Sequence, residues 1–417
     1  MNRFGIQYSN EVLKSFKKKD LYDNDTLDKF KEVRGILRKF QEGYIERKLE
    51  NADSFTKELF VNSDDISVLG TSTGEICLGF DEVKELIKDD WEGWGDLKID
   101  CENAHISING NVAWFSTNGS VKYNFEHTQE RYDRYVDYIK TTAEDNELTP
   151  KQRITFINWV LTLNYHQRDE QVRDYFWPIG LSGMLVKEGM KWKIIHLQFS
   201  MAKSNFPDER FENSKEYIES YEEQRSIVKK YKNNKVTEDI LEFLKSFENE
   251  FREKADISDK LIRKYFNEND DAYVIGPENK WYDGFENIKE FFVNSDMNNL
   301  SLDIENAIAS KSGKVNWITV MGTLKLNFTE DELINRSLQE LDNLFKSNFS
   351  SQEKLFAAQR SISYVLKECA AGVNYTCPIR MTAVISNDEN GLKFNCVHFS
   401  FPFYWIFEGK LDTVFHK

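Results

Sequence analysis

Two short segments with similar endings carry the side chains of this sequence that are best suited to chemistry. Residues 197–200 read LQFS, and residues 397–400 read VHFS. Because side chains alternate across a strand, residues two apart share one face. Two faces are therefore predicted, with Trp192, Ile194, His196, Gln198 and Ser200 on the first and Leu392, Phe394, Cys396, His398 and Ser400 on the second.

A basic residue stands on the segment that precedes the second of these faces. Arg380 and Thr382 occupy positions that Gly180 and Ser182 hold in the first half of the chain. If these faces line a pocket, Arg380 and His398 are the candidate catalytic residues. The imidazole would move a proton, or bind a ligand carboxylate, while the guanidinium steadies an oxyanion. The alternative is that local carboxylates satisfy both residues, which then only support the sheet. Because the halves differ here, we expect at most one chemically competent pocket.

Four tryptophans are further candidates for the walls of a pocket. Trp114 and Trp317 fall within strand-like segments, where each is either a pocket wall or plain core. Trp91 and Trp94 lie just before a strand, where a rim aromatic clamps an apolar ligand. The predicted ligand-binding residues are Trp91, Trp94, Trp114, His196, Gln198, Trp317, Arg380, Thr382 and His398. The expected ligand is a small molecule that is apolar or bears a carboxylate.

Paired carboxylates occur at matching places in the two halves. Asp100 and Glu102 are two residues apart, as are Asp303 and Glu305, so on a strand each pair shares a face. Both a solvated strand face and an acid–base pair are compatible with this spacing.

Several kinds of chemistry lack the residues that they need. The six histidines show no spacing typical of a metal site, so neither a metal nor another cofactor is predicted. No glycine-rich phosphate loop and no GxSxG elbow occurs, which disfavours nucleotide chemistry and serine hydrolysis. The formal net charge of −15 disfavours nucleic acid and anionic membranes as partners.

The sequence also bears on the cellular compartment. Its five cysteines include no CxxC pair, which favours reduced and mostly buried thiols. Neither a signal peptide nor a membrane span is visible. We therefore expect a cytoplasmic protein with no membrane partner.

An internal repeat must position the candidate residues. The pattern of residues 69–125 returns in residues 275–328, including the motif DCENA at 100–104 and DIENA at 303–307. The 417 residues are therefore predicted to form a lead-in (1–25), a first domain (26–207), a linker (208–235) and a second domain (236–417). The linker is rich in Glu, Lys and Tyr and is predicted to be helical.

Hydrophobic periodicity predicts the same order of elements in both halves. Apolar residues at steps of three and four indicate a first helix over 27–44. The period then changes to two, which predicts a strand over 97–108, a turn at 109–111 and a return strand over 112–125. A second hairpin spans 176–200. Helices followed by a twisted antiparallel meander form an α+β roll.

Each half is also predicted to contain an additional pair of helices between its two hairpins. Their apolar positions are Tyr132, Tyr135, Val136, Ile139, Ile154, Ile157, Val160 and Leu161 in the first half, and Ile334, Leu338, Leu341, Phe345, Leu355, Ile362, Val365 and Cys369 in the second. Because both halves have this helical hairpin, we infer that it predates the duplication.

Each half resembles the SnoaL-like branch of the nuclear transport factor 2-like superfamily. The resemblance rests on Gly79, Val112, Trp114, Trp192 and residues 196–200 in the first half, and on Trp281, Gly284, Val315, Trp317, residues 380–382 and residues 398–400 in the second. It implies two tandem cone-shaped rolls, each with helices packed on a curved antiparallel sheet and a pocket on the concave face. It also implies association through the outer sheets, so that the two rolls would form an internal pseudo-dimer. A homodimer of whole chains is the alternative.

Three functions are compatible with these features, because a fold does not determine a function. The first is a non-enzymatic protein that binds a small molecule or associates with other molecules. The second is a cofactor-independent lyase, isomerase or cyclase in which His398 or a carboxylate moves a proton. The third is a scaffold, which applies if aromatic side chains fill both cups.

Overall fold

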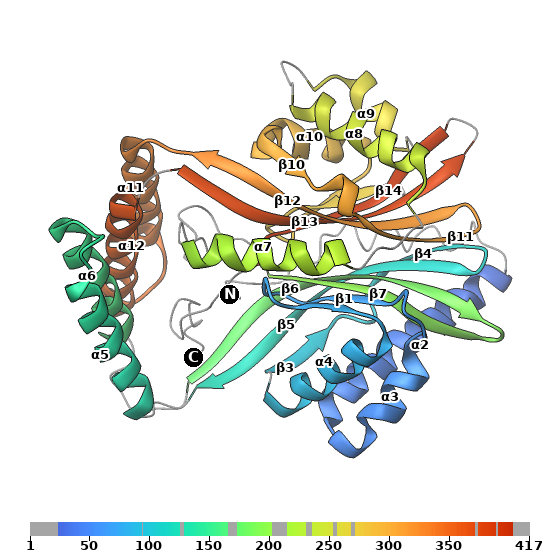
Figure 1. The fold of residues 1–417 in the computed structure, drawn as a ribbon, viewed down its shortest axis with the longest axis horizontal. Coiled ribbons are helices and arrows are strands. Elements are labelled where there is room, and N and C mark those ends of the chain that lie inside the picture. Colours follow the sequence, from blue (N-terminus) through green and yellow to red (C-terminus); the bar gives the residue numbers. More distant parts are fainter. Residues whose placement is uncertain are drawn as a thin grey trace.

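The computed structural model describes residues 24–93, 95–125, 129–165, 173–201, 215–230, 236–252, 257–267, 272–371, 374–388 and 391–402. Within these residues the chain forms two halves, each with a seven-stranded sheet (Figure 1). The two sheets lie back to back, helices cover the outer side of each sheet, and a separate group of helices stands at one end of the molecule. Trp94, one of the predicted ligand-binding residues, falls outside the described residues.

The first sheet mixes one parallel pair with antiparallel pairs. Its order is β2-β1-β7-β6-β5-β3, with β4 also paired to β5 and only β1 parallel to β7. The strands are β1 (Ser67–Leu69), β2 (Ile76–Leu78), β3 (Asp96–Ile99), β4 (His105–Asn109), β5 (Val112–Phe125), β6 (Arg173–Glu188) and β7 (Lys191–Met201). The helices packed on this sheet are α2 (Asn24–Glu46), α3 (Ala52–Leu59) and α4 (Phe80–Gly93), with a 3-10 turn η2 at Leu49–Asn51.

The second sheet repeats this order with its own elements. It runs β9-β8-β14-β13-β12-β10, with β11 also paired to β12 and β8 parallel to β14. The strands are β8 (Tyr273–Ile275), β9 (Trp281–Asp283), β10 (Leu300–Leu302), β11 (Ile308–Ser312), β12 (Val315–Asn327), β13 (Asn374–Asp388) and β14 (Gly391–Ser400). The helices are α8 (Glu238–Arg252), α9 (Asp259–Tyr265) and α10 (Phe285–Asn294), with 3-10 turns η3 (Asp296–Asn299) and η4 (Ile304–Asn306). The predicted fold class, two tandem α+β rolls, is confirmed.

The first helix of each half packs on its sheet through the stripe that the sequence predicts. In α2 the buried residues are Val33, Leu37, Phe40 and Tyr44, and in α8 they are Ile240, Leu244, Phe247 and Phe251. Both sets follow the steps of four, three and four that line one side of a helix. The hairpin turns sit at Gly110 (φ 63°), Gly189 (φ 61°) and Gly313 (φ 61°), where only glycine has no steric cost.

The predicted single strand over 97–108 is wrong, because a turn interrupts it. β3 ends at Ile99 and β4 begins at His105. In between, Asp100 accepts hydrogen bonds from the backbone N–H and the side-chain amide of Asn103. Asp303 accepts the same side-chain bond from Asn306 in the second half. The repeated acidic motif therefore folds a turn instead of placing two carboxylates on one strand face.

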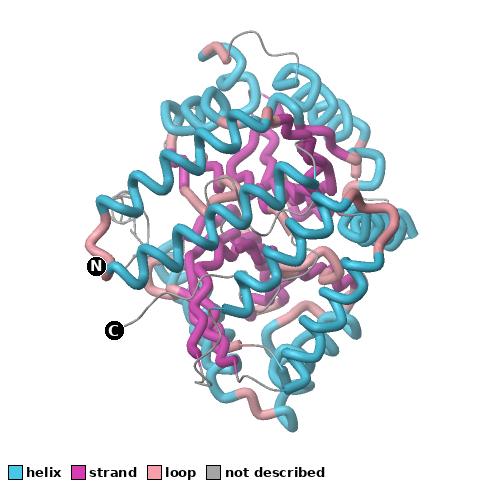
Figure 2. The backbone as a smooth tube through the Cα atoms, turned by 90° about the vertical axis from the view of Figure 1, so that its left-hand side faces the viewer, coloured by secondary structure: helices cyan, strands magenta, loops and turns pink. Residues whose placement is uncertain are grey.

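The inserted helices form the group at the end of the molecule. They are α5 (Gln129–Glu144) and α6 (Pro150–Tyr165) from the first half, and α11 (Glu330–Lys346) and α12 (Ser351–Ala371) from the second. The hairpins pack on each other through α6 and α12, with α5 beside α6 and α11 beside α12. Figure 2, which views this end, shows the helices side by side in front of the sheets. We call these four helices the helical layer.

The helix that links the halves lies along the contact between the two sheets. α7 (Lys215–Lys230) falls within the predicted helical linker. Its Tyr221 and Val228 share an apolar cluster with strand residues of both halves, including Leu69 and Met321. Arg225 also pairs with Asp303 at 2.8 Å. The domain boundaries themselves stay a prediction.

Candidate functional site

A β-bulge in each half decides where the candidate histidines point. In the first sheet Leu185 pairs with Ile194 but Met184 pairs with His196, so Ile195 is an extra residue. In the second sheet Ile385 pairs with Phe394 but Val384 pairs with Cys396, so Asn395 is extra. One extra residue moves every later side chain to the opposite face of a strand.

Residues before and after each bulge therefore lie on opposite faces of the sheet, so the two predicted shared faces are wrong. Trp192 and Ile194 belong to the helix-covered core of the first half, as Phe394 does in the second. His196, Gln198 and Ser200 instead lie on the face that meets the other sheet, together with Cys396, His398 and Ser400. The histidines thus lie between the two sheets and outside the cups.

The contact between the sheets has an apolar part that includes both mid-strand tryptophans. Its buried members come from both halves and are Val61, Val112, Trp114, Met184, Ile195, Tyr273, Ile275, Val315, Trp317, Val384 and Cys396. Trp281 packs at its edge and donates a hydrogen bond from its indole to the Asn118 amide oxygen (3.1 Å). Trp114 and Trp317 are therefore part of the core between the sheets.

The polar part of the contact is a set of hydrogen bonds that cross from one half to the other. Ser182 Oγ lies 2.7 Å from His398 Nδ1, and Ser200 Oγ lies 2.8 Å from His398 Nε2. Gln198 donates to the backbone oxygen of His398 (3.3 Å) and to Ser400 Oγ (3.1 Å). We call this set, with the bonds of His196 and Arg380 described next, the polar seam.

His196 occupies the related position in the first half. Its Nδ1 is 2.7 Å from Ser67 Oγ and its Nε2 is 3.3 Å from Thr382 Oγ1 of the second half. Thr382 also donates to the Gln198 amide oxygen. Both imidazoles are almost fully buried, at 1 % exposure for His196 and 0 % for His398. Burial lowers the pKa of His196 to about 3, and burial together with the nearby His196 lowers the pKa of His398 to about 3.

Arg380 joins a loop of the first half to a strand of the second. Its guanidinium donates to the backbone oxygens of Gly70 (2.6 Å), Ser72 (2.7 Å) and Thr73 (3.2 Å), in the loop between β1 and β2. The side chain is buried. These bonds use backbone carbonyls of the chain itself, which is a common way to satisfy a buried guanidinium.

The first half shows why glycine stands where the second half has Arg380. A Cβ atom at Gly180 would lie 2.7 Å from Ser200 Oγ and 3.1 Å from the Asn279 amide oxygen. Asn279 belongs to the loop between β8 and β9, and Ser200 donates a hydrogen bond to it (2.8 Å). The second half therefore contacts the first half through Arg380, whereas Gly180 of the first half leaves space for Asn279 of the second.

The interiors of both cups are packed with side chains. In the second half, rings from helices and strands pack together in a chain of contacts through Phe247, Phe251, Tyr265, Phe292 and Phe394. In the first half, Trp91 packs edge-on against Tyr44 and beside Phe55. Trp91 is 6 % exposed, so its side chain lies in the core and not at a rim.

The described residues contain neither a cluster of metal-ligating side chains nor a helix that could cross a membrane. No three His, Cys, Asp or Glu side chains in the described part of the chain are grouped so that they could hold a metal ion. Among the same residues, no helix combines the length and the apolar run that crossing a bilayer requires. All five cysteines are free, and three of them are buried.

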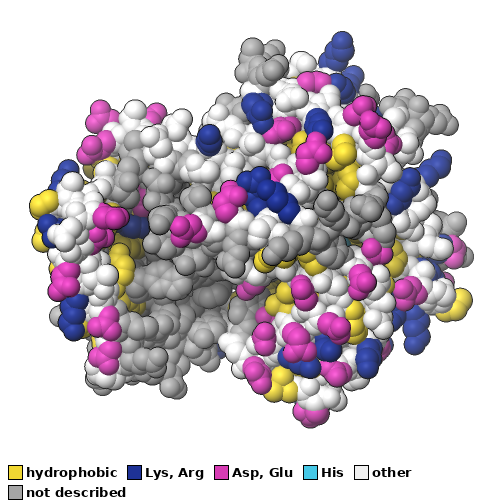
Figure 3. Space-filling model, viewed as in Figure 1, with side chains coloured by type: hydrophobic (Ala, Val, Ile, Leu, Met, Phe, Trp, Pro, Cys, Tyr) yellow, Lys and Arg dark blue, Asp and Glu magenta, His cyan; other side chains and the backbone are white. Residues whose placement is uncertain are grey.

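The helical layer carries an apolar surface that the sequence pattern alone would place in a core. Fifteen large apolar side chains stand exposed among the described residues, and ten of them belong to this layer. The ten are Val136, Tyr138, Ile154, Leu161, Ile334, Leu338, Phe345, Leu355, Ile362 and Leu366. Figure 3 shows apolar side chains on both edges of the layer that are visible in that view. A concentration of exposed apolar side chains of this kind is typical of an interaction site.

The arrangement of strands and helices agrees with a comparison with known families. Residues 33–136, which run from α2 into α5, match the family model of the SnoaL-like domain. The chain therefore carries a SnoaL-like domain in its first half, and the second half repeats its strand order.

Solved structures to which this chain is similar belong to the same wider group of folds. One is a nuclear transport factor 2-like superfamily protein from Salmonella enterica, with 12% identity, a TM-score of 0.28, and coverage of 43% of this chain and 95% of that one. Another is a protein of unknown function with a cystatin-like fold from Nostoc punctiforme, with 12% identity, a TM-score of 0.24, and coverage of 42% and 90%. A third is an NTF2-like protein of unknown function from Pseudomonas putida, with 9% identity, a TM-score of 0.26, and coverage of 43% and 92%.

These similarities assign no ligand or reaction to the chain. A comparison with curated proteins found none that matches. The function has to be argued from the residues of the chain itself.

Proposed function

We propose that this chain is a non-enzymatic association protein. In this account the two rolls form an internal pseudo-dimer, and the helical layer that the pseudo-dimer carries binds an amphipathic, basic helix of a partner protein. The observation that carries the proposal is the concentration of exposed apolar side chains on the four layer helices. Soluble proteins rarely leave such a surface uncovered without a use for it.

One of the two outer helices of the layer, α11, has one side packed in the layer and an apolar stripe left exposed. One side of α11 packs on α12 through Leu333 and Ser337, which are buried. The stripe Ile334, Leu338 and Phe345, at steps of four and seven, stays exposed, and Leu338 is 58 % exposed. A stripe with this spacing is the face that a helix offers to another helix. We call Ile334, Leu338 and Phe345 the α11 stripe.

The charges beside the α11 stripe favour a basic partner over a second copy. Asp331 and Asp342 flank the stripe and are exposed. Asp342 already pairs with Lys346, so the preference for a basic partner depends on Asp331 and on the formal net charge of −15 of the whole chain. In a twofold dimer the same surface meets itself, so these carboxylates would face carboxylates. A partner helix with Lys or Arg on either side of its apolar stripe avoids that repulsion and gains attraction during encounter.

The candidate catalytic residues support the non-enzymatic reading. A general acid–base histidine needs a pKa near the working pH and access to a substrate. His398 has a pKa lowered to about 3, is fully buried, and hydrogen-bonds to two serines through its ring nitrogens. Arg380 is buried against three backbone carbonyls.

The proposal is tested with a designed peptide, because it specifies only the chemistry of the partner. The probe is a fluorescently labelled amphipathic helix of about 18 residues, roughly 27 Å long, with leucines on one face and lysines on the other. Titration of the full chain, followed by anisotropy, is expected to give a dissociation constant of about 1–100 μM, or about −8 to −5.5 kcal/mol.

A scrambled peptide of the same composition is the matched control. It keeps the positive charge but has no apolar stripe, so it is expected to bind at least about tenfold more weakly. Equal binding of both peptides would reduce the interaction to charge attraction and overturn the proposal. Light scattering should give a monomer, and a stable dimer broken by Leu338→Asp would instead assign the layer to self-association.

A further inference from the structure

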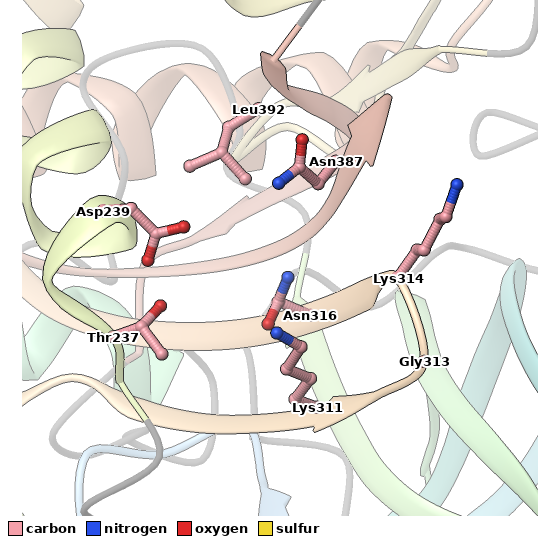
Figure 4. A pocket seen from close by; sticks show the side chains of 8 residues that line it. All are labelled: Thr237, Asp239, Lys311, Gly313, Lys314, Asn316, Asn387 and Leu392. Atoms are coloured by element: carbon pink, nitrogen blue, oxygen red, sulfur yellow. The ribbon is translucent and has the colours of Figure 1, made fainter. Parts of the chain in front are cut away.

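A polar pocket opens at the mouth of the second cup, beyond the packed rings. It has a volume of about 360 Å³ and lies between the start of α8 and the ends of two hairpins. Figure 4 shows its lining, which is Thr237, Asp239, Lys311, Gly313, Lys314, Asn316, Asn387 and Leu392. None of the ligand-binding residues predicted from the sequence belongs to this set, although Leu392 belongs to the face predicted for His398. The pocket is large enough for a small metabolite and too polar for an apolar one.

The floor of the pocket contains an amide, that of Asn316, whose polar atoms are not among the fully buried atoms that lack a hydrogen bond, so they reach the open space of the pocket. Asn316 is only 4 % exposed, and no described residue hydrogen-bonds to its side chain. It sits on the helix-facing side of β12, two residues before the buried Ile318. Its hydrogen bonds are therefore made with water, or with a molecule that binds in the pocket.

The first half has no such amide at the related position. Lys311 pairs with Asn316 across the β11–β12 hairpin just as Ile108 pairs with Ala113 across the β4–β5 hairpin. Ala113 is buried in the core of the first half. The asparagine is therefore not a requirement of the fold, because the repeated fold accepts alanine at this place.

The rest of the first-half mouth is closed by its own side chains. Trp192 donates from its indole to the Glu32 carboxylate (2.8 Å), and Lys187 donates to the same oxygen (3.0 Å). The related β-hairpin pair in the second half is Asn387 with Leu392, in the register that Lys187 has with Trp192. Leucine in place of the indole leaves the space open.

Opposite charges face this open space. Asp239, in the first turn of α8, corresponds to Glu32 of α2, but no described residue forms an ion pair with it. Figure 4 shows the Asp239 carboxylate turned towards the pocket from α8, with Asn387 and Asn316 across from it. The Lys311 ammonium group lies beside Asn316, whereas the Lys314 side chain points away from the others.

We propose that this pocket binds a small zwitterion of the free α-amino acid type. The ligand's ammonium group pairs with Asp239, and its carboxylate pairs with Lys311. The amides of Asn316 and Asn387 complete the hydrogen bonds, since a carboxamide both donates and accepts. Asp239 and Lys311 are both exposed, so each charge alone contributes little to binding, and a ligand that carries both charges pairs with both side chains at once.

The test is calorimetric titration of the full chain with free L-α-amino acids, each alone. At least one is expected to bind, and Asn316→Ala, which copies Ala113 of the first half, should weaken that binding at least about tenfold. Lys325→Met is the matched control and should change it less than about threefold, because this exposed lysine lies on β12 outside the pocket. Circular dichroism and thermal unfolding show whether each variant is folded.

Two derivatives of the ligand, each of which lacks one of its charges, distinguish a site for a zwitterion from a site for a single charge. The N-acetyl derivative of the binding amino acid lacks the ammonium group, and the amide derivative lacks the carboxylate. Each is expected to bind at least about tenfold more weakly. Undiminished binding of the N-acetyl derivative would overturn the role of Asp239, and binding of no amino acid, or binding that survives Asn316→Ala in the folded variant, would overturn the site. These outcomes leave the helical layer proposal untouched.

Discussion

Ser182 in the first half lies 2.7 Å from Nδ1 of His398 in the second half. The pair is buried, and the other ring nitrogen of His398 is held by Ser200. The two rolls are therefore joined by hydrogen bonds as specific as those inside one domain, and not only by apolar contact. We therefore expect that the polar seam stabilises the protein, so that its loss lowers the free energy of unfolding.

Removal of the Ser182 hydroxyl should weaken the joint between the rolls. Ser182→Ala leaves His398 Nδ1 buried without a partner, which costs about 1–3 kcal/mol of unfolding free energy. Urea denaturation followed by tryptophan fluorescence measures the change. Ser301→Ala, at an exposed position of β10, is the control and should fall within about 0.5 kcal/mol of the parent chain. An equal effect of both substitutions would contradict a structural role for the pair.

The buried histidines should make the protein sensitive to mild acid. Their pKa values are lowered to about 3 in the folded chain, from 6.5, so the unfolded chain binds more protons between these values. Stability is then fully present above about pH 6.5 and is lost as the pH falls towards 3, by about 1.4 kcal/mol per pH unit for each histidine.

A variant isolates this contribution from that of the carboxylates. His398→Asn removes one titrating group, so its unfolding free energy should fall less steeply between pH 6.5 and about 4 than that of the parent chain. Denaturation at several pH values gives both slopes. Parallel slopes would show that His398 keeps an ordinary pKa and lies in contact with water.

Asp90 should have the opposite effect on stability. It accepts a hydrogen bond from Tyr44 (2.7 Å), and burial raises its pKa from 3.8 to about 7. A raised carboxyl pKa means that stability is fully present below about pH 4 and is lost as the pH rises to 7. Asp90→Asn should therefore stabilise the chain at pH 8 but not at pH 4. Asp81→Asn, at an exposed position in the first turn of the same helix α4, serves as the control and should show no such pH dependence.

Arg380 should hold the loop between β1 and β2 in place. Arg380→Lys keeps the positive charge but loses the planar fork that reaches Gly70, Ser72 and Thr73. We expect a loss of about 2–4 kcal/mol of stability and faster proteolysis within residues 70–75. Limited proteolysis with mass spectrometry locates the cuts. Unchanged cleavage in this loop would show that it holds its conformation without the arginine.

The duplicated fold could be predicted from the sequence, because hydrophobic periodicity and glycine turns are local signals. The sequence alone shows the apolar steps of four, three and four in α2 and α8 and the turns at Gly110 and Gly313. The bulges at Ile195 and Asn395 are not, since an extra residue in a strand depends on the partner strand. For this reason the strands that carry His196 and His398 could be predicted from the sequence, but the face of the sheet on which the two side chains lie could not.

The sequence also left open what covers a predicted apolar stripe. The residues Ile334, Leu338 and Phe345 form the expected helical pattern, but periodicity does not distinguish a core from a docking face. The pocket around Asn316 had a signal that a closer comparison of the repeats would reveal. Asparagine stands where the first repeat has Ala113, and Leu392 stands where it has Trp192.

The dissociation constant of the leucine–lysine peptide for Leu338→Asp, set against that for Ile227→Asp, tests the association function most directly. Both residues are exposed and apolar, but Ile227 lies on α7, outside the helical layer. We predict at least about tenfold weaker binding for Leu338→Asp and less than about threefold change for Ile227→Asp. Equal affinities of the two variants, with both folded, would contradict the proposal that the helical layer is the binding surface.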